Sequence, residues 1–293
     1  MSEPAVQTWR VGDVAISRVE EMVVTGIVPL GSFLLDFDSA DLDRHGWVRD
    51  RFVGEGLTMP LSFHTFAIAV GGRRILVDTG CGNAKPRTGS AAGLFGDLDT
   101  PYLRRLDEAG FAPESIDTVI CTHLHVDHVG WNTRLVDGRW VPTFPNARYL
   151  FVDEDHRHWS RQEEEMHAAS FADSVLPVVE AGLADLVPSD HVVCEEVRLE
   201  PTPGHTPGHA SVRIDAGGAS AVITGDMAHH PLQLAVPDRS SFADTDPLAA
   251  ARTRHAFVER YADTATLVLG THFAPTGGYL RRDGATCVLT PDA

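Results

Sequence analysis

The sequence predicts an α/β fold in which helices cover β-sheets. Three observations lead to this prediction: β-rich segments occur in pairs joined by Gly-Gly turns, helical segments alternate with strands, and no linker separates one part of the chain from another. Hairpins that alternate with helices favour sheets covered by helices over a β-sandwich or a helical bundle. We therefore expect the 293 residues to form a single domain, 1–293.

The first elements expected along the chain are a hairpin, a helix and a strand. Segments 65–70 and 73–77 are β-rich and are joined by two glycines, which suit a tight turn. A short helix is expected from Thr100-Pro101 to Gly110, because this pair suits the cap and first position of a helix and glycine suits its end. Segment 118–121 is an apolar strand that leads directly into a cluster of histidines.

The second half of the chain continues this alternation. Segment 197–200 is expected to be a strand, and segments 211–214 and 220–224 form a second hairpin around Gly-Gly. Asp246-Pro247 opens a helix, and segment 266–270 is a further strand. The side chains expected on one face of that helix are Leu248, Ala251, His255, Val258 and Tyr261.

Two segments, 31–56 and 153–182, look like additions to this frame. The first carries aromatic side chains among many charged ones, and the second is helical in composition. One interpretation is that they are surface helices and loops that fill gaps in the core. The other is that they form walls of a substrate pocket, since loops on a rigid scaffold often do.

Composition and charge limit the classes of function. Lys and Arg number 24 and Asp and Glu number 41, which gives a net charge of −17. This charge repels phosphate backbones and anionic lipids, so we expect no nucleic-acid or membrane partner and a neutral small-molecule substrate. The 4 cysteines form no C-x-x-C pair and are expected to be reduced thiols. A secretory signal and an apolar run of about 18 residues are not apparent, so a cytoplasmic protein is expected.

The clearest chemical signal is the hexapeptide His123-Leu124-His125-Val126-Asp127-His128. A chain of this composition would contain this H-x-H-x-D-H pattern by chance about 0.003 times. Burying four such side chains together is unfavourable unless a metal satisfies them. His123 and His125 lie on one side of an extended turn and can converge on one ion, whereas Asp127 and His128 can serve a second ion.

Three further candidate ligands follow buried strands elsewhere in the chain. His205 lies in a loop rich in Pro and Gly, Asp226 follows an apolar strand, and His272 follows another. Polar residues at the C-terminal ends of buried strands are typical of functional sites in α/β proteins. The three residues are therefore expected to join the histidine cluster.

With these motifs, the segment from Phe63 to His272 resembles the metallo-β-lactamase-fold hydrolases. The resemblance implies an αββα sandwich that carries a dinuclear metal site. It also implies that Asp78 orients the metal-binding histidines and that His209 is a structural residue of its loop. The implied ligands are His123, His125 and His205 for the first ion, Asp127, His128 and His272 for the second, and Asp226 for both.

The cofactors implied by the resemblance are two Zn²⁺ ions per chain, and Fe, Mn or Co also suits these donors. Such a pair would hold a hydroxide formed from a water whose pKa is lowered to about 7. The expected reaction is attack of this hydroxide on a lactone or ester carbonyl, with Asp127 also counted as a catalytic residue. The resemblance suggests a homodimer as well.

Several branches of the family are excluded by comparison with their motifs. Asp226 stands where one subclass of β-lactamases has Cys, and the 21 residues after His272 leave no room for the helical domain of glyoxalase II. The flavodiiron branch requires a glutamate in the cluster, and the RNA-processing branch requires a basic groove. The remaining branch contains quorum-quenching lactonases and organophosphate or aryl-ester hydrolases.

His229 is the position at which the chain departs from the lactonases, which typically carry Tyr three residues after the bridging aspartate. This feature is more similar to organophosphate hydrolases, so phosphotriester hydrolysis is the alternative reaction. His229 is predicted as a catalytic residue that donates a hydrogen bond to the substrate oxygen. The alternative role is packing before Pro231. A metal-binding scaffold without activity is the alternative of another class.

Overall fold

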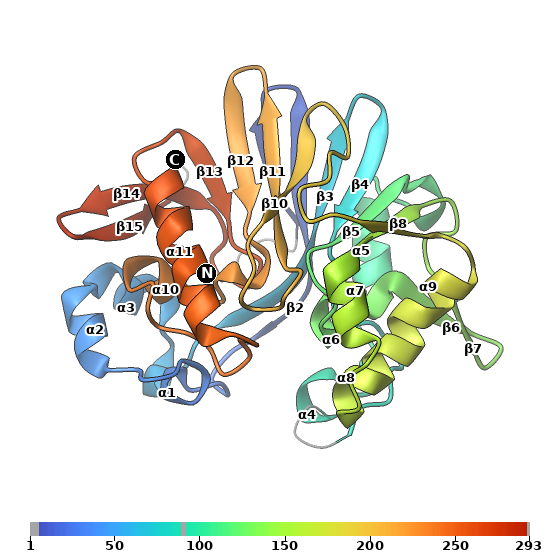
Figure 1. Cartoon of the computed structure of the whole chain (residues 1–293), viewed down its shortest axis with the longest axis horizontal. Coiled ribbons are helices and arrows are strands. Elements are labelled where there is room, and N and C mark those ends of the chain that lie inside the picture. The colour runs from blue at the N-terminus through green and yellow to red at the C-terminus, as the bar shows by residue number, and fades with distance from the viewer. Residues whose placement is uncertain (1–5, 89–91, 292–293) are drawn as a thin grey trace. The chain divides into compact units, whose positions relative to one another are not determined.

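The computed structural model describes residues 6–88 and 92–291, and its contacts divide the chain into two compact units. The first unit comprises Met1–Met22 and Phe63–His191, and the second comprises Val23–Ser62 and Val192–Ala293. Each unit contains a β-sheet accompanied by helices (Figure 1).

The first unit is built on a seven-stranded sheet with the strand order β1-β2-β3-β4-β5-β8-β9. Strands β4, β5, β8 and β9 run parallel to one another, so their carboxyl ends lie at the same edge of the sheet. A separate two-stranded sheet is formed by β6 and β7. The strands are β1 (Val6–Val11), β2 (Val14–Val24), β3 (Leu61–Val70), β4 (Arg73–Val77), β5 (Thr118–Cys121), β6 (Thr133–Val136), β7 (Arg139–Pro142), β8 (Arg148–Val152) and β9 (Ala184–Val187).

Short helices connect these strands. Segment 122–125 joins β5 to helix α6, and helix α7 follows β8 directly, so both helices begin near the edge where the parallel strands end. The helices of this unit are α4 (Ala92–Phe95), α5 (Tyr102–Glu108), η3 (Pro113–Ser115), α6 (Val126–Val129), η4 (Gly130–Asn132), α7 (Asp153–Trp159), α8 (Glu165–Ser170), the π-helix η5 (Phe171–Val175) and α9 (Leu176–Glu180).

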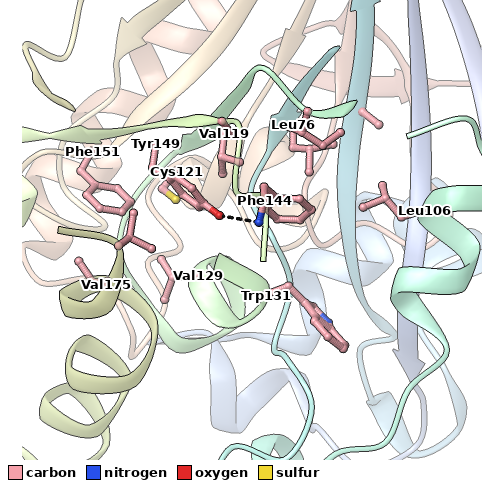
Figure 2. Close-up of a cluster of buried hydrophobic side chains, with 14 of the residues drawn as sticks. Leu76, Leu106, Val119, Cys121, Val129, Trp131, Phe144, Tyr149, Phe151 and Val175 are labelled. Carbon is pink, nitrogen blue, oxygen red and sulfur yellow. Dashed lines mark hydrogen bonds between the residues drawn. The ribbon is translucent and has the colours of Figure 1, made fainter. Parts of the chain in front are cut away.

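A cluster of buried hydrophobic side chains fills the first unit (Figure 2). Cys121 precedes the histidine hexapeptide and belongs to this cluster, as do Val129 and Trp131, which follow it. The hydroxyl of Tyr149 accepts a hydrogen bond from the backbone N–H of Phe144 at 3.0 Å within the cluster. The core therefore anchors the chain on both sides of the hexapeptide.

The second unit is built on a six-stranded sheet in the order β10-β11-β12-β13-β14-β15, in which β12 and β13 are parallel. Its strands are β10 (Val197–Pro201), β11 (Ala210–Ala216), β12 (Ala219–Ile223), β13 (Thr266–Leu269), β14 (Gly278–Asp283) and β15 (Thr286–Thr290). Its helices are α1 (Leu30–Phe33), α2 (Ser39–Arg44), α3 (Gly46–Phe52), η1 (Glu55–Leu57), η6 (Gly225–Met227), α10 (Leu232–Ala235) and α11 (Pro247–Tyr261).

Both predicted hairpins are present. Strands β3 and β4 are antiparallel around Gly71-Gly72, and β11 and β12 are antiparallel around Gly217-Gly218. Strand β5 has the predicted bounds, β10 extends one residue beyond the expected segment 197–200, and β13 ends one residue before the end of the expected segment 266–270. All four of these turn glycines have positive φ values, which glycine adopts without strain.

The start of helix α5 differs from the prediction. The helix begins at Tyr102 and Pro101 occupies its cap position, so Thr100 is not the cap. The hydroxyl of Thr100 donates instead to Glu21 Oε1 at 3.1 Å, a contact between distant parts of the sequence that local pattern does not reveal.

The buried face of helix α11 also differs from the prediction. The helix begins at Pro247, and the side chain of Asp246 caps it by accepting a hydrogen bond from the N–H of Ala249 at 2.9 Å. Of the residues expected on one face, Tyr261 is buried, but Leu248 and His255 are exposed, so this face is not the buried one. The buried residues are Ala250, Arg254, Phe257 and Tyr261.

The two added segments are largely helical. Segment 31–56 contains α2, α3 and η1, and segment 153–182 contains α7, α8, η5 and α9. That they form walls of a substrate pocket stays a prediction. Across the described residues, none of the helices combines the length and the hydropathy that a membrane crossing requires.

Candidate functional site

The histidine hexapeptide brings its four candidate ligands together at the carboxyl end of β5. The ring of His123 lies 4.6 Å from the ring of His125 and 4.0 Å from the ring of His128, between centroids. His128 Nε2 lies 3.6 Å from Asp127 Oδ2. His123 and His128 are buried, whereas His125 and Asp127 are partly exposed. The first unit thus supplies a compact group of three imidazoles and one carboxylate.

Asp78 holds one of these histidines in place. It follows β4, the strand next to β5, and its Oδ2 lies 2.9 Å from Nδ1 of His128. Its Oδ1 accepts a hydrogen bond from the N–H of Thr122 at 2.8 Å. A carboxylate on Nδ1 favours the tautomer whose Nε2 carries the lone pair, which is the form that binds a metal. Asp78 therefore lies where the family resemblance predicted an orienting aspartate.

Glu21 fixes the loop behind the hexapeptide. Its carboxylate is buried and accepts hydrogen bonds from the N–H groups of Cys81 and Gly82 at 2.6 and 3.2 Å, and from Trp131 Nε1 at 2.7 Å. Burial raises the pKa of Glu21, although these hydrogen bonds oppose the rise. No sequence signal pointed to Glu21, because its partners lie about 60 and 110 residues away.

Two residues of segment 153–182 flank His125. The ring of Trp159 lies 4.8 Å from the ring of His125, and the ring of His167 stacks on it at 5.4 Å. Burial lowers the pKa of His167, which favours the neutral imidazole. The composition of this segment indicated a helix, but it did not single out His167.

The second unit brings three histidines around one carboxylate. Asp226 follows β12 and is buried. Its Oδ2 lies 3.5 Å from His205 Nε2 and 3.2 Å from His229 Nε2, and its Oδ1 lies 3.1 Å from His272 Nε2. His272 is oriented by its Nδ1, which donates to the backbone oxygen of Ser62 at 3.0 Å. The structure therefore brings His205, Asp226 and His272 together within this unit.

His209 has a different role from His205, although both lie in the same loop. The N–H of Asp226 donates to His209 Nε2 at 2.8 Å, and His209 Nδ1 lies 3.1 Å from the backbone oxygen of Thr202. Both ring nitrogens therefore have backbone partners. This arrangement agrees with the structural role that the resemblance implied for His209.

His229 lies among the candidate ligands instead of packing apart from them. Its ring is parallel to that of His272 at 5.8 Å and meets the ring of Phe33 edge-on at 5.0 Å. Its Nδ1 is buried and has no hydrogen-bond partner in the described part of the chain. Burial lowers the pKa of His229, although Asp226 opposes the effect. The ring of His229 is thus buried against the carboxylate of Asp226.

Asp244 is a member of this group that the sequence did not indicate. Ligand atoms of His205, His229 and Asp244 lie within 4.8 Å of one another. Burial alone would raise the pKa of Asp244, but His205, His229 and Arg254 hold it well below its usual range. Asp244 is therefore an anion buried beside two histidines.

Comparisons with known proteins place these residues in a family context. A model of the metallo-beta-lactamase superfamily matches residues 62–272. An N-acyl homoserine lactonase of a Bacillus species is 27% identical over 207 residues, which cover 67% of this chain and 72% of that protein. A protein of Mycobacterium tuberculosis named probable metallo-hydrolase is 25% identical over 181 residues, and the match spans 57% of each chain.

Two solved structures resemble the whole chain. The hydrolase AbOPH of the beta lactamase superfamily has a TM-score of 0.78 and 23% identity, covering 100% of this chain and 99% of that chain. AidC, a dizinc quorum-quenching lactonase in complex with a product, has a TM-score of 0.80 and 20% identity, covering 99% and 98%. These likenesses confirm the predicted fold class, an α/β fold of the metallo-β-lactamase type.

Proposed function

The chain belongs to the metallo-beta-lactamase superfamily, and we propose that it is a metal-dependent hydrolase that opens lactones or cleaves esters. The observation that carries this proposal is the group around Asp226, in which three imidazoles contact one buried carboxylate. The matched segment, 62–272, contains this group and the histidine hexapeptide.

The donors suit divalent metal ions. Burying a carboxylate is costly unless a positive charge compensates it, and a metal ion can provide this charge. Imidazole nitrogens and carboxylate oxygens without a thiolate are typical ligands of zinc, iron, manganese or cobalt in catalytic sites. The residues therefore fit a metal centre, and we propose zinc as the ion in both positions.

We propose the same ligand assignment that the resemblance implies. When bound, the ions would lower the pKa of a coordinated water to about 7 and polarise the oxygen of the substrate. The proposed ligands are His123, His125 and His205 for one ion, Asp127, His128 and His272 for the other, and Asp226 for both.

Two residues are proposed to act on the substrate in addition. Asp127 is partly exposed, so a substrate can approach its carboxylate, and we keep it as both a ligand and a catalytic residue. His229 is proposed to donate a hydrogen bond to the substrate oxygen as negative charge develops there. The contacts of His229 with Asp226 and His272 support this role over simple packing before Pro231.

The proposed substrate is a neutral lactone or aryl ester. Relatives named N-acyl homoserine lactonase support a lactone, and the net charge of −17 disfavours an anionic substrate. The alternative is a phosphotriester, favoured by His229 at the position where lactonases typically carry Tyr. A cytoplasmic location and a homodimer stay predictions.

A panel of substrates tests this proposal. The zinc-loaded protein should be compared on N-acyl homoserine lactones of two chain lengths, an aryl ester and a phosphotriester, with kcat/KM as the readout. We expect the highest value for a neutral lactone, and a lower value for a carboxylate-bearing analogue of the same shape. A higher value for the phosphotriester would support the alternative, and metal binding without any hydrolysis would support a scaffold.

A further inference from the structure

A second orienting carboxylate lies in the second unit, and none of the motifs in the sequence pointed to it. We propose that Asp244 is a positioning residue that fixes the ring of His205 for metal binding, and that Arg254 holds Asp244 in place. The inference rests on the proposed function, because it assigns a role toward the metal centre. All the contacts that carry it lie within the second unit.

The contact between Asp244 and His205 is direct and buried. Nδ1 of His205 lies 3.1 Å from Oδ1 of Asp244, and the two side chains are 1% and 0% exposed. A carboxylate has no hydrogen to donate, so the ring N–H must be on Nδ1. This tautomer leaves the lone pair on Nε2, the nitrogen that faces Asp226.

Asp244 is itself restrained by two donors on its other oxygen. Its Oδ2 accepts a hydrogen bond from the N–H of Ser241 at 2.9 Å and lies 3.3 Å from Nη1 of Arg254. Arg254 is fully buried on α11, and its Nη2 and Nε donate to Ser240 Oγ at 2.7 Å and to the backbone oxygen of Pro237 at 2.8 Å. The carboxylate therefore has little freedom to rotate away from His205.

The backbone of His205 is held by the same part of the chain. The N–H of Thr245 donates to the oxygen of His205 at 2.9 Å, and the N–H of Asp246 donates to the oxygen of Gly204 at 2.9 Å. Gly204 has a φ of +132°, and a Cβ there would lie 2.2 Å from the backbone nitrogen of Ala250. The segment that leads into α11 thus positions both the ring and the backbone of His205.

His209 provides an internal contrast. It lies four residues from His205 in the same loop, yet its Nε2 accepts the N–H of Asp226, and its Nδ1 lies 3.1 Å from the backbone oxygen and 2.8 Å from the hydroxyl of Thr202. The pair Asp244–His205 instead matches the pair Asp78–His128 of the first unit, where a buried carboxylate also faces Nδ1. In both pairs, a carboxylate on Nδ1 orients the histidine so that Nε2 can bind a metal.

The tautomer can be measured in the wild-type chain without any substitution. The experiment is NMR of the metal-free protein labelled with ¹⁵N-histidine, with His205 assigned by its absence from a His205→Gln protein. We expect His205 to carry its proton on Nδ1. A proton on Nε2, or rapid averaging of both tautomers, would overturn the inference.

Metal affinity provides the second test. In Asp244→Asn, we expect zinc affinity at one of the two positions to fall about 10- to 100-fold, measured by competition with a chelator at a temperature where circular dichroism shows folded protein. The matched control is Asp238→Asn, since Asp238 also pairs with a histidine, His255, but at an exposed position. The control should keep wild-type affinity.

The outcomes separate this inference from the proposed function. If the wild-type protein binds no zinc, the proposed function fails. If the wild-type protein binds two ions and Asp244→Asn binds them with unchanged affinity, only the role of Asp244 fails. If Asp244→Asn does not fold, the tautomer of His205 in the wild-type chain still tests the role of Asp244.

Discussion

His229 is the residue whose contacts distinguish a catalytic role from packing most clearly. Its ring touches Asp226 and the ring of His272, and its Nδ1 is buried without a hydrogen-bond partner among the described residues. A carboxylate has no hydrogen to donate, so the ring hydrogen of His229 lies on Nε2, the nitrogen that faces Asp226. This N–H lies beside the candidate ligands, and it is the donor that we propose for the substrate oxygen.

His229→Ala should lower kcat for lactones by about 10²- to 10³-fold, because one hydrogen-bond donor to the developing charge is lost. Metal content should stay at the wild-type value, since His229 is outside the proposed ligand set. His229→Tyr should retain more lactonase activity than the alanine variant, because the phenol also donates. Wild-type kcat in His229→Ala would show that the residue only packs, and loss of a metal ion would show that it is a ligand.

His230 makes the stability of the fold depend on pH. Burial lowers its pKa to about 4, and its Nε2 donates to the backbone oxygen of Phe52 at 2.9 Å. In an unfolded chain the pKa is about 6.5, so only the unfolded state binds a proton between these two values. The stabilisation from neutral His230 is therefore complete above about pH 6.5 and is lost as the pH falls to about 4.

His230→Asn should reduce this dependence. The free energy of unfolding of the wild-type protein should fall more between pH 7 and pH 4 than that of the variant, by roughly 3 kcal/mol. Urea denaturation of the metal-free proteins at both pH values measures the difference, with the exposed His255→Asn as control. Equal losses in wild type and His230→Asn would contradict the assignment.

The residue scale also shows where sequence reasoning succeeds. The spacing within the hexapeptide identified four candidate ligands, because they are neighbours in the chain as well as in space. The contact between His205 and Asp244 joins residues 39 positions apart, and nothing in the local sequence links them. Asp244, Glu21 and His167 therefore required the structure.

At the scale of elements, helix α11 shows how a buried charged residue makes a buried face hard to predict from the spacing of apolar residues. The sequence predicted a shared face containing Leu248, His255 and Tyr261, because these residues recur at helical spacing. The structure buries Arg254 and Phe257 instead, since Arg254 is neutralised by Asp244 and bonded to backbone oxygens. The strands were predicted more accurately, because two apolar runs joined by a Gly-Gly turn strongly indicate a β-hairpin.

Two alanine substitutions on this helix test the corrected face. Phe257→Ala should reduce the free energy of unfolding by about 3–5 kcal/mol, because the side chain is buried and a cavity results. Leu248→Ala should change it by less than about 0.5 kcal/mol, because Leu248 is 73% exposed. Thermal or urea denaturation provides the measurement. A larger loss of unfolding free energy in Leu248→Ala than in Phe257→Ala would contradict the buried face described here.

At the scale of the whole molecule, the division into units does not follow the order of the chain. Each unit is formed from two separate segments, and the chain passes between units after residues 22, 62 and 191. Neither unit therefore corresponds to one continuous segment of the chain. That the chain forms one domain, 1–293, stays a prediction, and the connectivity supports it.

Calorimetry tests this organisation. We expect the metal-free protein to unfold in one transition, with a calorimetric enthalpy equal to the van't Hoff enthalpy, as single domains usually do. A control scan at a different heating rate excludes kinetic distortion. Two transitions, each altered by substitutions in one unit alone, would show that the units are separate domains.

The central claim is that the proposed ligands hold a pair of ions that enables hydrolysis. Its most direct test is the zinc content of the purified wild-type protein and of Asp226→Ala, measured by mass spectrometry alongside hydrolysis of a neutral lactone. We predict two ions per wild-type chain, and a lower content with no detectable hydrolysis in Asp226→Ala, since Asp226 contacts three histidines. Unchanged zinc content and full hydrolysis in Asp226→Ala would contradict the claim.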